Sequence, residues 1–262
     1  MAAVTNDAVL VVCDVLGVQT LPTVLDVGPR QDRVADFADA RAQALLALRD
    51  AGLVDAHDDV DADLGAALYI LAAPEREIAA RVVTETGVRR ICLARRGAGH
   101  AIAVREGDDL DITTTWAEED GAALARPILA ALGACPPADI PTFSLPADEL
   151  ARRFDGAESG PDFTGVPYEL GVTDKAAIEF GMAMAECRAH AEIVAYLHED
   201  GVTTRSSGAV AVFDTARGRI AASPGTAADL RVWTTVTPGS DHRVAQAISQ
   251  LVGTLPGGRW MP

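Results

Sequence analysis

The side chains with the clearest capacity for chemistry are Cys187, His190 and His198, which lie close together in the sequence. A thiolate and neutral imidazoles are zinc ligands. The two-residue gap before His190 fits poorly with the change from helix to strand expected there, and no second ligand pair follows. The sequence therefore predicts no metal site and no cofactor.

Two further patterns look like ligand-binding loops but lack essential residues. The aspartates at 55, 58, 59, 61 and 63 lack the central glycine and distal glutamate of a calcium loop. Asp61 or a neighbour is expected instead to cap the helix that follows. The glycines at 97 and 99 are followed by Ile102 where a dinucleotide loop has its third glycine, and they join two expected strands. Hydrolase, Walker and zinc-protease motifs are missing from the sequence, so we expect the protein not to be an enzyme.

The composition indicates a cytoplasmic protein. The formal net charge of −16 argues against nucleic acid or an anionic membrane as the partner, and 49% apolar residues suffice for a core. The four cysteines include no C-x-x-C pair, which fits a reducing compartment. The first residues lack the basic region of a signal peptide, and no apolar run reaches the roughly 20 residues of a membrane helix. We therefore expect no membrane insertion.

A repeat relates the two halves of the chain. Residues 109–133 align with 229–253 without a gap, and Thr114-Thr115 falls on Thr234-Thr235. Upstream, with small gaps, Glu77 and the residues after it resemble Glu192 and its successors. Alanine- and valine-rich strands could converge on such a pattern, but its order and spacing favour a true repeat.

The hydrophobic periodicity predicts the same element order in each half. The fold class expected is α+β, with two quasi-symmetric ααββββα halves that form a central antiparallel sheet flanked by helical bundles. We expect a single domain with halves at about 1–135 and 172–262, joined by a proline-rich connector at 136–171 that holds one short helix at 148–154. The expected helices are 31–52, 61–72, one through residues 124–132, 173–187 and 241–253, and the expected strands are 77–84, 88–95, 101–105, 110–115, 191–197, 209–213, 219–222 and 231–236.

Several ordered blocks carry a resemblance to a known family. They are LAAPE at 71–75, LARRG at 93–97, AVFDTARGRI at 211–220, WTT at 233–235, PGSDHR at 238–243 and TLPGGRW at 254–260. In this order and spacing the chain resembles the EspG family of ESX (type VII) secretion-associated proteins of mycobacteria and related actinobacteria, over nearly its whole length.

The resemblance implies a function. Members of that family are cytosolic chaperones that bind the helical tip of the PPE protein in a PE–PPE heterodimer and deliver the pair to an ESX system. It implies an α/β body with a central antiparallel sheet, helical bundles and a quasi-two-fold axis. Partners would be a PE–PPE pair, ESX machinery components and a weak homodimer. Some relatives carry a long loop between the second and third strands, which is short here, so partner preference does not carry over.

Candidate partner-binding residues come from two places. Trp233 falls on the polar face of its expected strand beside Arg231, which suits an interface hot spot, although helices that cover it would make it core. The segment 213–219 forms an expected hairpin tip that supplies a hydrophobe and mixed charges, or ordinary turn chemistry. The predicted partner-binding residues are Phe213, Asp214, Thr215, Arg217, Arg219, Arg231, Trp233, Glu85 and Thr86.

The alternative hypothesis is a hydrolase or metal-dependent enzyme that uses a cleft between the two halves. It requires polar groups that converge in that cleft and perturbed pKa values there.

Overall fold

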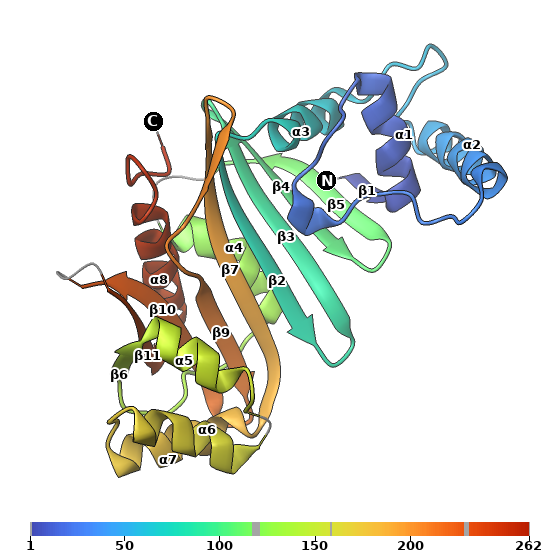
Figure 1. Ribbon diagram of the computed structural model, residues 1–262. Helices are drawn as coiled ribbons and strands as arrows, with labels where there is room; N and C mark the ends of the chain where they lie inside the picture. Colours follow the sequence, from blue (N-terminus) through green and yellow to red (C-terminus); the bar gives the residue numbers. More distant parts are fainter. Residues whose placement is uncertain (1, 117–120, 158, 228–230, 262) are drawn as a thin grey trace.

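The architecture is one antiparallel sheet with helices on both faces (Figure 1). The computed structural model describes residues 2–116, 121–157, 159–227 and 231–261. The first half contains β1 (Ala2–Thr5), α1 (Asn6–Leu16), the 3-10 turn η1 (Thr23–Leu25), α2 (Val34–Asp50), α3 (Ala62–Ala72), β2 (Arg76–Thr84), β3 (Gly87–Arg96), β4 (Gly99–Glu106), β5 (Asp109–Thr115) and α4 (Gly121–Leu132). The second half contains β6 (Phe143–Pro146), α5 (Ala147–Phe154), α6 (Gly160–Glu169), α7 (Asp174–Met184), β7 (Cys187–Glu199), β8 (Val202–Arg205), β9 (Val210–Thr215), β10 (Gly218–Thr226), β11 (Val232–Pro238) and α8 (Asp241–Gly253).

The sheet is symmetric about its centre. Its strand order is β1-β5-β4-β3-β2-β7-β9-β10-β11-β6, and β8 pairs only with β7. At the centre, Ala79 of β2 pairs with Val194 of β7. These two residues are 115 positions apart in the chain, which is also the offset that relates Glu77 to Glu192 in the repeat. An axis that relates the halves therefore passes between β2 and β7, as the repeat requires.

The expected α+β class with a central antiparallel sheet is confirmed, but each half contains more elements than predicted and the second half begins earlier, at β6. The segment 136–171 is not merely a connector with one helix, since it holds β6, α5 and α6. β6 pairs with β11 as β1 pairs with β5, so each half begins with a short edge strand and three helices. The short strands escaped notice because four residues carry too little periodicity to identify. The single-domain organisation stays a prediction, and the unbroken sheet supports it.

Some element ends differ from expectation, whereas the helices that a side chain caps begin close to where they were expected. α2 begins at Val34 rather than at 31, and α7 ends at Met184, so that Cys187 starts a strand. Asp61 caps α3 as expected, because its carboxylate accepts the amide hydrogen of Leu64. The helix 241–253 matches its prediction, with the Ser240 hydroxyl accepting from Arg243 at its start.

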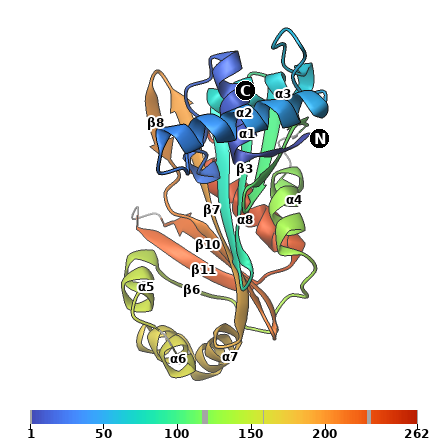
Figure 2. The ribbon, with the colours of Figure 1, turned by 90° about the vertical axis from the view of Figure 1, so that its right-hand side faces the viewer.

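The two faces of the sheet are covered differently (Figure 2). On one face α4 and α8 pack against each other and against the central strands, where Val244 and Ile248 are fully buried. On the other face α1–α3 cover the strands of the first half, and α5–α7 pack at the far end of the second half. The central strands are therefore left uncovered on that second face.

The two helical covers have different cores. The core under α1–α3 is aliphatic and contains Leu48, Leu68 and Leu71. The core beside α7 is aromatic, where Phe180 packs edge-to-face on Phe143 with ring centroids 5.4 Å apart. Five of the six phenylalanines of the chain belong to this second core or pack against it: Phe143, Phe154, Phe163, Phe180 and Phe213.

Candidate functional site

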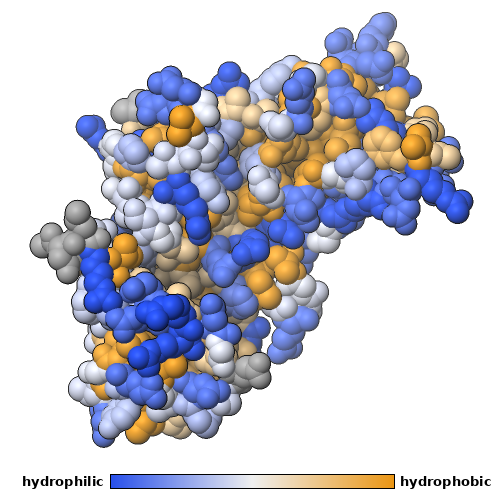
Figure 3. All heavy atoms as spheres, in the orientation of Figure 1, coloured by the Kyte–Doolittle hydropathy of each residue, from blue (hydrophilic) through white to orange (hydrophobic). Residues whose placement is uncertain are grey.

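The uncovered face of the central strands forms a groove of about 750 Å³, which we call the central groove. Figure 3 shows this face hollowed between the α1–α3 end and the α5–α7 end. Its floor includes Ala79 and Val194, the pair at the axis, so both halves build it. The residues that line it are Thr23, Val24, Glu77, Ala79, Ala80, Arg81, Arg90, Glu192, Val194, Tyr196, His198, Thr203, Arg205 and Ala209.

Charged side chains on the groove floor form pairs across the axis. The Arg81 guanidinium on β2 lies 2.5 Å from the Glu192 carboxylate on β7, and both side chains are about half exposed. Such a pair contributes little to stability, because solvent screens it. It can exchange its partner for a charge on another molecule at low cost, which suits recognition.

The position related to Glu192 by the repeat is Glu77, and its surroundings are different. Glu77 is buried, and its carboxylate lies 3.2 Å from Nε2 of His198. Nδ1 of His198 in turn contacts the Thr203 hydroxyl on β8 at 3.1 Å. Burial raises the pKa of Glu77, and the neighbouring His198 partly opposes that rise. The contact ties β2, β7 and β8 together at one end of the groove.

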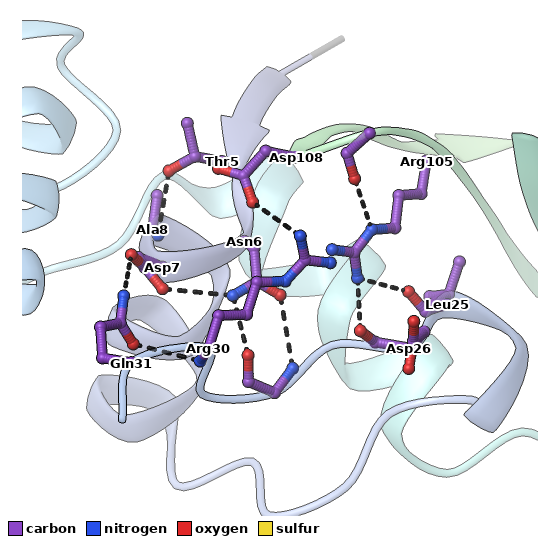
Figure 4. Close-up of polar contacts among 12 residues, drawn as sticks. Thr5, Asn6, Asp7, Ala8, Leu25, Asp26, Arg30, Gln31, Arg105 and Asp108 are labelled. Atoms are coloured by element: carbon purple, nitrogen blue, oxygen red, sulfur yellow. Dashed lines mark hydrogen bonds and ion pairs between the residues drawn. The ribbon is translucent and has the colours of Figure 1, made fainter. Parts of the chain in front are cut away.

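The wall formed by η1 is held in place by an arginine of the sheet. Figure 4 shows Arg105 of β4 pointing at the turn, where its Nη1 donates to the carbonyls of Leu25 and Asp26 at 2.7 and 2.5 Å. The buried Asn6 side chain exchanges two hydrogen bonds with the backbone of Gly28, just beyond the turn. Because these donors and acceptors are buried or partly buried, the turn cannot move without leaving them unpaired.

The predicted docking hairpin, between β9 and β10, is largely internal. The Arg219 side chain is 1% exposed and donates to both carboxylate oxygens of Asp214, at 2.6 and 2.9 Å. It also donates to the carbonyl of Gly133 after α4. The buried Thr215 hydroxyl donates to the carbonyl of Gly218. Asp214, Thr215 and Arg219 therefore join the hairpin to the body. Binding of a partner by Thr215 and Arg219 stays a prediction, and both side chains are buried in this structure.

Other predicted residues gather at one end of the sheet. Thr84 pairs with Ala189 and Ala189 with Asp214, so the β2–β3 turn lies two strands from the β9–β10 turn. That spacing is about 10 Å. The exposed Glu85 and Thr86 occupy the first turn. At the second, Arg217 forms an exposed ion pair with Glu186. Phe213 packs against the aromatic core, and its ring lies 6.3 Å from that of His190.

Arg231 and Trp233 lie away from this group. Trp233 pairs with Gly225 and Pro146 at the far end of β11. Val236 on the same strand is in the core beside α7, so strand alternation places Trp233 on the opposite face. The Arg231 guanidinium is 6.0 Å from the Trp233 ring and bonds to Glu149 of α5 at 2.6 Å. The nine predicted residues thus do not form one surface.

The zinc candidates are separated by the strand on which they lie. His190 and His198 are both on β7, eight residues apart, which is about 26 Å along a strand. Among the described residues, no three histidine, cysteine or acidic side chains come together as a metal site. Within the same residues, no helix is both long and apolar enough to cross a membrane.

Sequence reasoning missed the central groove itself. Glu77 and Arg81 interrupt an otherwise apolar strand at alternate positions, which marks a face that is not core. The glutamate at 192 that repeats Glu77 also lies on the groove floor, so the repeat itself carries the signal for this face.

The fold and the groove define a class: α+β proteins built from two related halves around one antiparallel sheet, with an open groove at the axis. A family model described as the EspG family matches residues 5–250, and the chain belongs to this family. The resemblance noted in the sequence is thereby confirmed.

Individual members of this family are similar to the chain in sequence and in structure. The chain is 29% identical to the ESX-3 secretion-associated protein EspG3 of Mycolicibacterium smegmatis, covering 98% of this chain and 88% of that protein. It is 28% identical to the ESX-1 secretion-associated protein EspG1 of Mycobacterium tuberculosis, with the same coverage. The structure of the Mycobacterium tuberculosis type VII secretion system chaperone EspG5, in complex with a PE25–PPE41 dimer, matches with a TM-score of 0.82 at 20% identity, over 99% of this chain and 98% of that one.

Proposed function

We propose that this protein is a cytoplasmic chaperone that binds the helical tip of a PPE protein in a PE–PPE heterodimer and targets the pair to an ESX secretion system. Membership of the EspG family and a fold shared over nearly the whole chain with EspG5, which was solved with a PE25–PPE41 dimer, support this function. The protein acts by stoichiometric binding and not by catalysis. ESX components and a weak homodimer remain predicted partners.

The observation that carries the proposal is a pair of exposed apolar side chains on α7, which packs at the far end of the sheet face whose centre is uncovered. α7 leaves Ile178 and Met182, one turn apart, 48% and 44% exposed. Helical residues four apart lie on one face, so these two form a small apolar ridge. Phe213, which packs on the core beneath α7, lies at the same end of the sheet. An apolar ridge beside exposed, exchangeable ion pairs can receive an amphipathic helical tip.

We assign the predicted residues accordingly. Glu85, Thr86, Phe213 and Arg217 are proposed to contact the partner. Asp214, Thr215 and Arg219 hold the hairpin in place. Arg231 joins β11 to α5 through Glu149, and Trp233 lies on the opposite face of β11, so we leave both outside the proposed interface.

The test is co-expression with PE–PPE pairs from the same genome, followed by purification and mass determination by light scattering. We expect a 1:1:1 complex with a subset of pairs. Ile178→Asp should weaken that complex at least tenfold, because a charge replaces an apolar contact. Trp233→Thr is the matched control on the opposite face and should bind normally.

Two outcomes would contradict the proposal. If no pair binds although all are folded, the chaperone function is wrong. If Trp233→Thr abolishes binding while Ile178→Asp does not, and both variants melt like the parent protein, the interface lies on the other face.

The alternative of an enzyme in the cleft has one observation in its favour, the Glu77–His198 pair at the groove. The nearby Cys92 is no candidate nucleophile, because complete burial raises its pKa well above the ordinary value. A chaperone remains the better-supported function.

A further inference from the structure

Two buried arginines stand opposite each other on the α4/α8 face of the sheet. Arg76 of β2 pairs in register with Arg95 of β3, and the two residues are 8% and 4% exposed. The segment 254–261 after α8, which we call the C-terminal strap, lies over them. Nη2 of Arg76 donates to the carbonyl of Pro256 at 3.0 Å, and the buried Trp260 indole donates to Nε2 of His100 at 3.0 Å.

The positive charge of this pair is only partly compensated. Nη1 of Arg95 lies 3.0 Å from the carboxylate of Glu75, which is half exposed. Among the described residues, Arg76 has no carboxylate within ion-pair distance. Burial and the neighbouring Arg95 lower the pKa of Arg76, and the more distant carboxylates of Glu199 and Glu75 oppose this only in part. His100 adds no negative charge, and burial followed by Arg95 lowers its pKa too.

Two hydrogen-bond donors of the pair are sealed from solvent. Within the described part of the chain, neither Nη1 of Arg76 nor Nε of Arg95 has a hydrogen-bond partner, and both atoms are buried. A buried guanidinium donor without an acceptor loses its hydration without gaining a hydrogen bond, so folded proteins rarely retain one.

A second arginine pair shows how the fold handles the same problem elsewhere. Arg90 and Arg105 are also register partners, on β3 and β4. The η1 turn meets them with the carboxylate of Asp26, 3.2 Å from Arg90, and with its carbonyls. Nη2 of Arg105 is also buried without a partner among the described residues, so the difference between the two pairs is the carboxylate and not the number of unpaired donors. The C-terminal strap offers the Arg76–Arg95 pair one carbonyl and no carboxylate.

We infer that a small inorganic anion of halide size binds between Arg76 and Arg95 beneath the C-terminal strap. Both donors are enclosed, which favours a monatomic anion over phosphate or a substrate carboxylate. Bound there, the anion accepts from both orphaned donors, offsets the repulsion of the two cations, and fastens the strap to the first half. The site is on the face opposite the central groove and independent of the proposed partner.

The direct test uses bromide as the probe. Crystals of the full chain grown in sodium bromide should show an anomalous peak within hydrogen-bonding distance of both Arg76 Nη1 and Arg95 Nε. An ordered water there in place of bromide, or a peak only at molar salt, would overturn the inference.

Solution stability gives a second readout. Thermal unfolding is compared in chloride and in gluconate at equal ionic strength. With chloride at ten times its dissociation constant, Tm should be about 3 °C higher than in gluconate. Arg76→Met should abolish that difference, whereas Arg152→Met, an exposed arginine on α5, should keep it. If Arg76→Met showed the same rise of Tm in chloride as the parent protein, the proposed site would be contradicted, even if bromide were seen nearby.

Discussion

The two helical covers of the sheet occupy equivalent positions and are built differently. The α1–α3 cover buries aliphatic side chains and is fixed to the sheet by Arg105 and Asn6. The α5–α7 cover buries phenylalanines and leaves Ile178 and Met182 exposed on α7. The central sheet and the contact between α4 and α8 remain similar in the two halves, because each of these features is built jointly by both halves at the axis. Among the described residues, the helices of each cover pack chiefly on the strands of their own half, so the two covers are free to differ and one can serve recognition.

Truncation of the aromatic core should have the largest effect on stability. Phe180 is 4% exposed and touches both Phe143 and Phe154. Phe180→Ala should lower the free energy of unfolding by about 3–5 kcal/mol, because it removes a ring and leaves a cavity. Chemical denaturation measures this loss. Phe37→Ala, on the half-buried surface of α2, is the matched control and should cost clearly less. Equal losses would mean that the aromatic core has no special weight.

The β9–β10 hairpin offers two arginines in contrasting settings. Arg219→Met leaves the Asp214 carboxylate, whose side chain is only 13% exposed, without its partner and should cost about 3 kcal/mol. Arg217→Met breaks only an exposed pair with Glu186 and should cost under about 1 kcal/mol. Urea unfolding of both variants separates them. A small loss in Arg219→Met would return that residue to the candidate interface.

The smallest effect concerns the two glutamates related by the repeat in the central groove. Because burial raises the folded-state pKa of Glu77, its contribution to stability is full below the ordinary carboxyl pKa and falls as the pH rises through the raised pKa. Glu77→Gln should therefore raise the free energy of unfolding at pH 7 by up to about 1 kcal/mol and change it little at pH 4.

The control for that variant is Glu192→Gln, which removes the exposed partner of Arg81. It should give no gain at either pH. A gain at pH 4 as large as that at pH 7 in Glu77→Gln would show that ionisation of Glu77 is not the cause.

Most strands and the major helices could be predicted from periodicity, because each buried element repeats apolar residues at its own period. The strands β2–β5 and the helix α8 show this clearly, with ends within two residues of expectation. The edge strands β1 and β6 could not, since four residues give no period. The burial of the candidate site could be predicted only in part: the turns at 85–86 and 216–217 are exposed as expected, yet Thr215 and Arg219 near the second turn are buried.

Arg219 shows why the rest of the site escaped prediction. A turn that contains Asp, Arg and Gly is the same local sequence whether its charges face water or an internal carboxylate. Arg219 is held inside by contacts with the carbonyl of Gly133 and the carboxylate of Asp241, which are 86 and 22 residues away in the chain.

The sequence alone determined the family, the repeat, the antiparallel sheet and the acidic charge of the chain, because local periodicity and composition suffice for these. Only the tertiary structure decided that the axis passes between Ala79 and Val194, that a groove opens there, and that Arg76 and Arg95 meet under the strap. These features arise where strands from distant parts of the chain pair, and a contact between distant residues leaves no period in the sequence.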